Sequence, residues 1–174
     1  SPFDDFTCCI GTGMENPVKY GESIYFHGRD GSLYVNLFIG GSTRIENVAG
    51  TAIEIVQKTD YPWNGQIAIT VNPESTAHFA IRVRIPDRST SNLYTAIPEV
   101  SGYNSLKVNG KIITPRIKNG YAVIHREWNK GDLIELDLPM KSQRIVSDER
   151  VKANHGQLAL AYGPLVYSVE TADQ

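Results

Sequence analysis

Cysteine, excess charge of either sign and long apolar runs are all scarce in this chain. Only two cysteines, Cys8 and Cys9, occur in 174 residues, and neighbouring cysteines cannot staple distant segments, so no disulfide framework is expected. The net charge of −2 points neither to nucleic acid nor to a strongly anionic partner. No apolar run approaches the roughly 20 residues of a membrane-spanning helix, and no Asn-x-Ser/Thr sequon is present. The composition therefore predicts a globular protein without nucleic acid or a membrane span.

The length and the start of the chain limit what it can be. A chain of 174 residues with 41% hydrophobic and 21% charged residues is long enough for one domain with a real core. No charged-then-apolar signal sequence opens the chain at Ser1-Pro2, and we interpret that start as a processed or cloned boundary. It leaves the compartment open, and we expect a periplasmic or secreted location in preference to a cytoplasmic one.

Short strands separated by glycine, asparagine and proline dominate the chain from Glu22 onward. The clearest strand is 78–85, in which Phe79, Ile81, Val83 and Ile85 alternate with His78, Arg82 and Arg84, as expected for one buried and one wet face. Asn109-Gly110 predicts a type I′ hairpin between 105–108 and 111–113. Further strands are expected at 23–27, 33–39, 51–58, 66–71, 121–125, 132–138, 157–161 and 165–169. In 51–58, Ile53 and Ile55 are expected on one face, with Glu54 and Gln57 off it.

This pattern predicts an all-β protein with an antiparallel, jelly-roll-like β-sandwich. The polar segment 88–103 is interpreted as a long loop, where the sandwich would break into two sub-sheets. Before the strands, 12–20 is expected to begin a short helix, with Thr12 as its N-cap and Glu15 completing a capping box.

Cys8 and Cys9 are the residues best suited to chemistry. A thiolate is both a nucleophile and a soft zinc ligand, so the pair can be a metal site, a nucleophile, or both. The alternative is two half-buried thiols with no chemical role. The following Gly11-Thr12-Gly13 lacks the pattern of a phosphate loop, and we expect a tight turn there beside the pair. The four histidines and the carboxylates show no ligand-like or paired spacing, and Trp63, Trp128 and the tyrosines are more often core or turn anchors than sugar platforms.

Several motifs together resemble the C-terminal portion of glycoside hydrolase family 127 and its relatives, a group long catalogued as a domain of unknown function. Cys8-Cys-Ile-Gly-Thr-Gly-Met-Glu-Asn16 and Lys19-Tyr-Gly-Glu-Ser-Ile-Tyr-Phe26 resemble the end of its catalytic domain. The later motifs resemble its β-sandwich region, in the right order: Tyr61-Pro-Trp-Asn-Gly65, Arg82-Val-Arg-Ile-Pro86, Val108-Asn-Gly-Lys111, Trp128-Asn-Lys-Gly-Asp132, Leu136-Asp-Leu-Pro-Met140 and Ala161-Tyr-Gly-Pro-Leu-Val-Tyr167.

The resemblance implies an α/α barrel followed by β-sandwich domains. Residues 1–22 would be the end of that barrel, a short helical or irregular remnant, and 23–174 the sandwich. It also implies a retaining β-L-arabinofuranosidase-like enzyme in which Cys8 is the nucleophile and Cys8 and Cys9 bind zinc. The acid/base glutamate and the other zinc ligands would lie in the missing N-terminal barrel. The chain alone is therefore expected to be inactive, although its parent would act on a carbohydrate substrate. Formation of a homo-oligomer is left open by the sequence. A non-catalytic carbohydrate-binding or structural β-sandwich is the alternative to a part of an enzyme.

Overall fold

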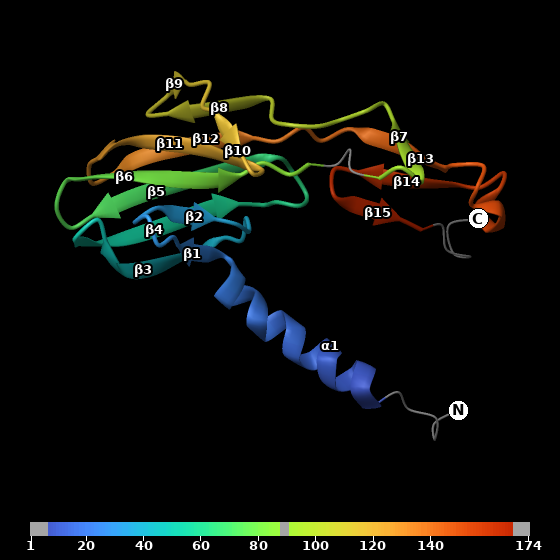
Figure 1. The fold of residues 1–174 in the computed structure, drawn as a ribbon, viewed down its shortest axis with the longest axis horizontal. Helices are drawn as coiled ribbons and strands as arrows, with labels where there is room; N and C mark the ends of the chain where they lie inside the picture. Colours follow the sequence, from blue (N-terminus) through green and yellow to red (C-terminus); the bar gives the residue numbers. More distant parts are fainter. Residues whose placement is uncertain (1–6, 88–90, 169–174) are drawn as a thin grey trace.

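In the part of the chain that the structure describes, one α-helix and two 3-10 turns accompany a series of short strands (Figure 1). The computed structural model describes the backbone of residues 7–87 and 91–168, and the side chains from residue 11 onward within those ranges. Helix α1 (Thr7–Lys19) and the 3-10 turn η1 (Tyr20–Ser23) precede the strands. In the described part of the chain, no helix has the length and apolarity to cross a bilayer.

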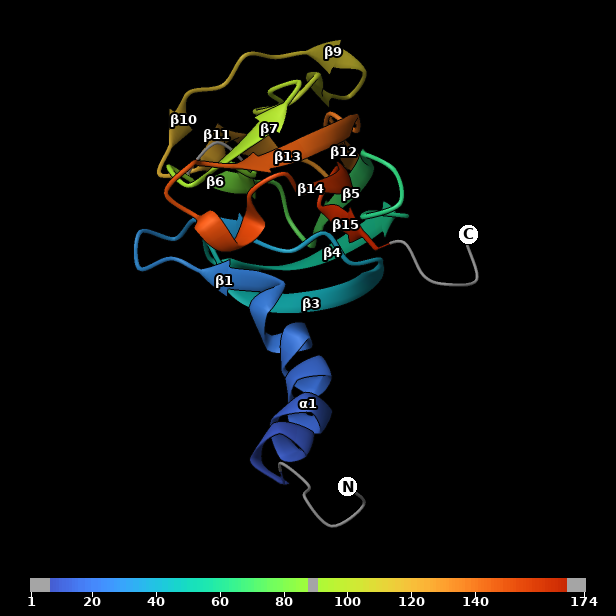
Figure 2. The ribbon, with the colours of Figure 1, turned by 90° about the vertical axis from the view of Figure 1, so that its right-hand side faces the viewer.

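Two sheets pack face to face to form a sandwich. The five-stranded sheet has the order β1-β2-β6-β11-β10, and the six-stranded sheet has the order β3-β4-β5-β12-β8-β9. The first comprises β1 (Tyr25–His27), β2 (Leu33–Val35), β6 (Ala77–Arg84), β11 (Tyr121–Trp128) and β10 (Ile117–Lys118). The second comprises β3 (Gly41–Val48), β4 (Thr51–Thr59), β5 (Gln66–Pro73), β12 (Asp132–Asp137), β8 (Ser105–Val108) and β9 (Lys111–Ile112). Figure 2 shows β1 and β3 at the end of the sandwich from which α1 leaves.

The strand pairs of both sheets are antiparallel except for β2 and β6, which are parallel. The core lies between the two sheets and consists mainly of isoleucine, valine and leucine. β-branched side chains suit such a pleated, buried surface, and the prediction of an all-β sandwich is confirmed.

Strand β6 carries the alternation that the sequence predicts. Phe79, Ile81 and Val83 are buried, whereas Arg82 and Arg84 on the opposite face contact the rings of Tyr34 and Tyr121. Figure 1 shows β6 beside β11 within its sheet. Alternation predicted the buried face correctly because the side-chain period of a strand is two.

The hairpin at Asn109-Gly110 also has its predicted geometry. The two residues have φ angles of 52° and 75°, and a type I′ turn requires positive φ at both central positions. The Asn109 side chain also donates to an Asp132 carboxylate oxygen at 2.8 Å and accepts from the Leu133 N–H at 2.8 Å. The turn is therefore tied to the neighbouring strand β12 as well as to its own hairpin.

A separate four-stranded sheet lies beside the sandwich along the long axis (Figure 1). Its order is β15-β14-β13-β7, formed by β7 (Tyr94–Ile97), β13 (Ser142–Ser147), β14 (Leu158–Tyr162) and β15 (Leu165–Tyr167). The interpretation of 88–103 as a loop is wrong at 94–97, because β7 pairs along β13. That pairing joins segments about fifty residues apart in the sequence, and a short strand with a distant partner leaves little local signal.

Gln57 corrects the predicted face of β4. It is 2% exposed and lies on the core side with Ile53 and Ile55. Its amide nitrogen donates to the Tyr25 hydroxyl at 2.9 Å and to the Leu37 carbonyl at 3.2 Å. The period of two places residue 57 with 53 and 55, and these hydrogen bonds offset much of the cost of burying a polar amide.

Candidate functional site

The Cys8-Cys9 pair lies in the first turns of α1, whose backbone is helical from Thr7 to Lys19. The side chains of the pair lie outside the described residues, so their geometry stays a prediction. The helix begins earlier than predicted. Thr12 is therefore inside it rather than at its N-cap, and Gly11 and Gly13 are helical residues rather than a tight turn.

Helix α1 lacks the features that make an isolated helix stable. It contains Gly11, Gly13 and Pro17, and each glycine costs about 1 kcal/mol relative to alanine, with proline costing about 3 kcal/mol in a helix interior. Thirteen residues is also near the lower limit for a helix in water even with good helix formers. Beyond its continuation into η1, α1 has no extensive contact with another described element, and Figure 1 shows it projecting from the sandwich. The helix therefore needs packing partners that the described residues do not supply.

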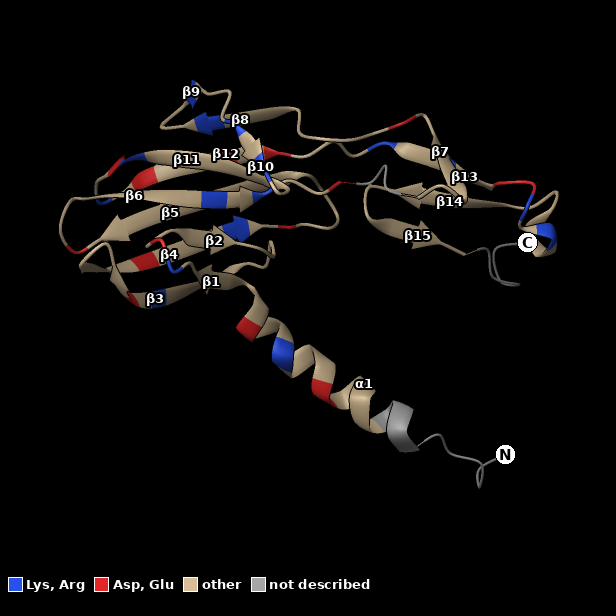
Figure 3. Ribbon diagram, in the orientation of Figure 1, with Lys and Arg blue, Asp and Glu red and all other residues tan. Residues whose placement is uncertain are grey.

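The exposed face of α1 and η1 is partly apolar. Met14 and Val18 are 74% and 80% exposed, and Tyr20 is 54% exposed. Residues four apart share one face of a helix, so Met14 and Val18 form a short apolar stripe. Figure 3 shows acidic and basic residues also distributed along this segment. Such a mixture is typical of a helix with one face against a neighbour and another in water.

Zinc fits this chain only in part. Two adjacent thiols have the right chemistry, but a zinc site is usually four-coordinate. Among the residues that the structure describes, no group of three or more histidine, cysteine, aspartate or glutamate side chains is placed to hold a metal ion. The further ligands that zinc requires are not found in the described part of the chain, so these residues alone do not complete a zinc site.

Asp30 belongs to a hydrogen-bonded network on the surface of the sandwich. It accepts hydrogen bonds from the Ser32 hydroxyl and, at 3.2 Å, from the Ser32 N–H. It also pairs with Arg82 at 2.8 Å. The Ser32 hydrogen bonds, followed by Arg82, lower the pKa of Asp30 to about 2. A Cβ at Gly28 would collide with the Asp30 and Ser32 side chains, so glycine allows this arrangement. The network pins the β1–β2 connection to β6, which is a structural role.

A pair of histidines lies beside this network. His78 on β6 and His125 on β11 have ring centroids 4.4 Å apart in an edge-to-face arrangement. The spacing of the histidines along the sequence gave no sign of this contact. It arises because β6 and β11 are antiparallel neighbours, with His125 opposite Ala80 and Glu127 opposite His78.

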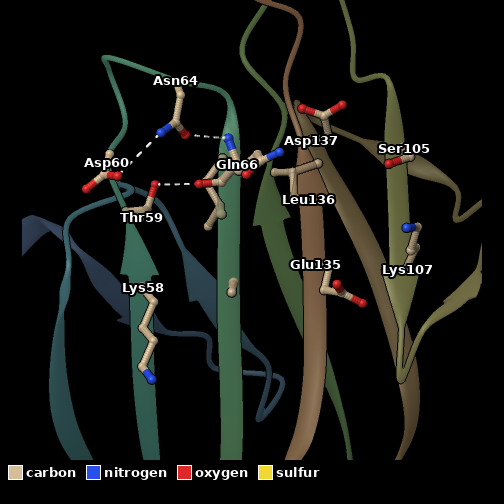
Figure 4. Close-up of a pocket in the computed structure, with 12 residues that line it drawn as sticks. Lys58, Thr59, Asp60, Asn64, Gln66, Ser105, Lys107, Glu135, Leu136 and Asp137 are labelled. Atoms are coloured by element: carbon tan, nitrogen blue, oxygen red, sulfur yellow. Dashed lines mark hydrogen bonds between the residues drawn. The ribbon is translucent and has the colours of Figure 1, made fainter.

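A polar hollow of about 560 Å³ lies on the outer face of the six-stranded sheet (Figure 4). Ala68 forms its floor, because it pairs with Lys58 on one side and with Glu135 on the other. The rim carries side chains from four strands and one turn: Lys58, Asp60, Asn64, Gln66, Ser105, Lys107, Glu135 and Asp137. The alternation within β12 places Glu135 and Asp137 on the wet face of the sheet. The hollow between them and Lys58, however, depends on the order of the strands in the sheet.

The hollow can bind polar groups but is not built for hydrolysis. Asp137 already accepts a hydrogen bond from the Asn104 amide at 3.0 Å, and Asn64 accepts from the Gln66 N–H at 3.0 Å. Most glycoside hydrolases use two carboxyl groups that face one sugar, whereas Glu135 and Asp137 lie two residues apart on one strand of an open sheet. The Cys8-Cys9 pair is therefore still the better candidate for chemistry.

Comparison with solved structures defines the class of protein first. The fold matches parts of glycoside hydrolase structures, including one titled "Glycoside hydrolase" at 27% identity and a TM-score of 0.80, over 99% of this chain and 27% of that one. A GH127 β-arabinofuranosidase matches at 29% identity and a TM-score of 0.78, over 86% of this chain and 24% of that one. Ara127N-Se, a GH127 β-L-arabinofuranosidase from Geobacillus stearothermophilus T6, matches at 36% identity and a TM-score of 0.70, over 84% and 21%.

The sequence then identifies the family. Residues 32–140 match the model described as "Beta-L-arabinofuranosidase, GH127 middle domain", and residues 142–174 match the "Glycoside hydrolase family 127 C-terminal domain". A curated non-reducing end β-L-arabinofuranosidase of Bifidobacterium longum subsp. longum is 31% identical over 98% of this chain. The chain belongs to glycoside hydrolase family 127, and it spans about a quarter of the length of that relative.

Proposed function

We propose that this chain is the β-sandwich portion of a β-L-arabinofuranosidase-type glycoside hydrolase and that it braces a catalytic domain that precedes it. Membership of the family through its middle and C-terminal models is the observation that carries this proposal. The relatives are about four times as long, which supports a further domain in the longer protein.

Helix α1 is the proposed connection to that domain. Burying the stripe of Met14 and Val18 against a neighbour would gain about 1.5–3 kcal/mol for each side chain that is fully buried. That gain is of the size needed to offset two glycines and a proline in the helix. The catalytic domain would therefore stabilise α1, and α1 would position Cys8 and Cys9 at its boundary.

Cys8 is the proposed nucleophile of the longer enzyme, as the family resemblance implies. In a double displacement its thiolate sulfur forms a bond to the anomeric carbon while the bond from that carbon to the leaving oxygen breaks. A general acid outside this chain donates a proton to the leaving oxygen, and water later displaces the sulfur. Cys8 and Cys9 are the residues of this chain that would hold zinc in the longer protein, and bound zinc keeps a thiol deprotonated at neutral pH.

The test compares the 174-residue chain with the longer protein on an aryl β-L-arabinofuranoside. We expect turnover only by the longer protein, because the chain lacks the proposed general acid. Cys8→Ser in the longer protein should lower kcat by a factor of at least 10³, whereas Lys111→Gln on the distant hairpin should leave kcat unchanged. Release of sugar by the chain alone at the rate of the longer protein would refute the proposal that the general acid lies outside this chain. A fully active Cys8→Ser enzyme would refute the proposal that Cys8 is the nucleophile.

Trp63 favours a second candidate function, carbohydrate binding. It is 70% exposed and lies in the same turn as Asp60 and Asn64, which line the polar hollow. An aromatic ring beside polar groups is suited to stack on a sugar ring. Calorimetric titration of the chain with arabino-oligosaccharides should then give heat that Trp63→Ala removes. No heat with the unsubstituted chain would reject this role.

A further inference from the structure

Two histidines lie together on the solvent face of the five-stranded sheet. His78 on β6 and His125 on β11 have ring centroids 4.4 Å apart, and their strands are paired along their full length. The register places His125 opposite Ala80, so the two histidines are diagonal neighbours on one face. That face is turned away from the core, because the adjacent Phe79 is buried whereas both histidines are exposed. Extended strand pairing therefore holds the two imidazoles close together.

The ring nitrogens of the pair are open to a ligand. Within the part of the chain that the structure describes, neither imidazole makes a hydrogen bond or an ion pair, and the two rings contact each other. A hollow of about 490 Å³ lies against both rings, and Ala80 and Val123 form part of its wall. Because the Ala80 side chain is small, an ion in this hollow can reach the nitrogens of both rings.

The charges around the pair do not oppose a cation. Arg82 lines the same hollow, but its guanidinium is paired with the Asp30 carboxylate at 2.8 Å. The guanidinium also lies over the ring of Tyr34, which belongs to β2, on the side of β6 away from β11. Glu127 is opposite His78 and shares its face of the sheet. With Arg82 balanced by Asp30, the carboxylate of Glu127 leaves a negative charge beside the histidines.

Imidazole chemistry indicates which cation fits. Neutral imidazole is a preferred ligand of copper, nickel and zinc ions, and zinc–nitrogen bonds of about 2.0–2.1 Å place two nitrogens on one ion about 3 Å apart. The ring centroids are already 4.4 Å apart, so the change required is a rotation of two side chains on a fixed backbone. We propose that His78 and His125 together bind one divalent transition-metal ion of this class. In the described chain no group of three or more ligand side chains is placed to hold a metal ion, so water completes the coordination.

Calorimetric titration with Ni²⁺ tests the site directly. The titration uses the Cys8→Ser/Cys9→Ser chain, so that thiolates do not take up the ion. We expect a single saturable Ni²⁺ site, with a Kd that rises at least about tenfold in His78→Ala and in His125→Ala. His125→Gln, which keeps a polar side chain but removes the imidazole, should weaken binding in the same way. A Kd above about 1 mM before any histidine is replaced, or one that neither histidine substitution changes, would overturn the proposal.

Two other histidines supply the matched controls. His27 and His155 are also exposed, and among the described residues neither ring contacts a second histidine. His27→Ala and His155→Ala should therefore leave the Kd for Ni²⁺ unchanged. An equal loss of affinity in these controls would show that the ion binds single, scattered imidazoles, which contradicts a two-histidine site.

The stability of the same chain gives an independent measurement. At a free Ni²⁺ concentration about 100 times the Kd, binding to the folded state should raise the urea midpoint by about 1 M, and His125→Ala should at least halve that rise. Cu²⁺ should act at lower concentrations than Ni²⁺, whereas Mg²⁺ and Ca²⁺, which take oxygen ligands, should leave the midpoint unchanged. A rise with Mg²⁺ or Ca²⁺, or an undiminished rise with Ni²⁺ in His125→Ala, would contradict the proposal. Neither measurement involves catalysis, so the outcome is independent of the activity proposed above.

Discussion

Substitution of Gly65 tests how the sandwich is joined to the four-stranded sheet. It ends the turn before β5 and lies against the segment that leads from β12 toward β13. A Cβ at this position would overlap the Leu138 carbonyl oxygen, and it would lie 2.9 Å from the Leu138 carbonyl carbon and 3.1 Å from Met140 Cγ. The Gly65 carbonyl also accepts a hydrogen bond from the Leu138 N–H at 2.8 Å. The obstacle to Gly65→Ala is therefore mainly backbone, which cannot rotate away as a flexible side chain can.

The expected cost follows from these two contacts. Relieving the overlap means moving the backbone apart, and overpacking of this kind costs about 1–3 kcal/mol. Weakening the hydrogen bond to Leu138 adds about 0.5–1.5 kcal/mol, so the free energy of unfolding should fall by about 1.5–4.5 kcal/mol in total. With a urea m-value of about 2 kcal/mol/M, the midpoint of unfolding should fall by about 1–2 M.

Urea unfolding followed by tryptophan fluorescence measures this midpoint, because Trp128 is fully buried and reports on the sandwich core. Gly21→Ala is the matched control, since nothing lies within 4 Å of a Cβ built on Gly21. Its midpoint should stay within the equivalent of about 0.5 kcal/mol of the unsubstituted chain. Equal midpoints for Gly65→Ala and Gly21→Ala would refute the close approach of Gly65 to Leu138.

Three further predictions concern single contacts in the sandwich. The pKa of Asp30 is lowered in the folded chain, so its stabilising contribution is present above the unfolded pKa of about 4 and is lost as the pH falls toward 2. Urea unfolding midpoints should therefore show that Asp30→Asn is less stable than the unsubstituted chain at pH 6. The difference should vanish near pH 2. Trp128→Phe removes the indole hydrogen bond to the Phe79 carbonyl at 3.1 Å and leaves a void, so the free energy of unfolding should fall by about 1–3 kcal/mol in chemical denaturation followed by circular dichroism. Asn109→Ala should lower the melting temperature more than Asn109→Gly does, because both lose the side-chain hydrogen bonds but only alanine is strained at a φ of 52°; equal melting temperatures would contradict this.

Local pattern carried most of the prediction of the sandwich. The alternation of Phe79, Ile81 and Val83 and the turn at Asn109-Gly110 act within a few residues, so they can be interpreted without knowing the partner strand. Strand β7 was missed because its four residues become a strand only by pairing with β13. Strand β13, missed for the same reason, carries Gln143 and Arg144 among few apolar residues.

The candidate site was predictable in its chemistry but not in its surroundings. The adjacency of Cys8 and Cys9 is a local fact, and it points to thiolate chemistry without any structure. The helix around them was placed too late, because Gly11, Gly13 and Pro17 all disfavour a helix in isolation. We propose above that a neighbouring domain stabilises the helix, and such a neighbour would leave no trace in the local sequence of this chain.

The position of β7 has a consequence for how this region can be inherited and synthesised. The chain passes from the sandwich into the four-stranded sheet at β7, returns at β8, and leaves again at β13. The family's own division falls between residues 140 and 142, yet β7 lies before that division and pairs with a strand after it. A gene rearrangement that cut at residue 141 would therefore separate β7 from its sheet. On the ribosome, β7 (Tyr94–Ile97) would emerge well before its partner β13 (Ser142–Ser147), so β7 has to stay unpaired until β13 has been made. The sandwich and the four-stranded sheet therefore have to be inherited together, although their strands form separate sheets.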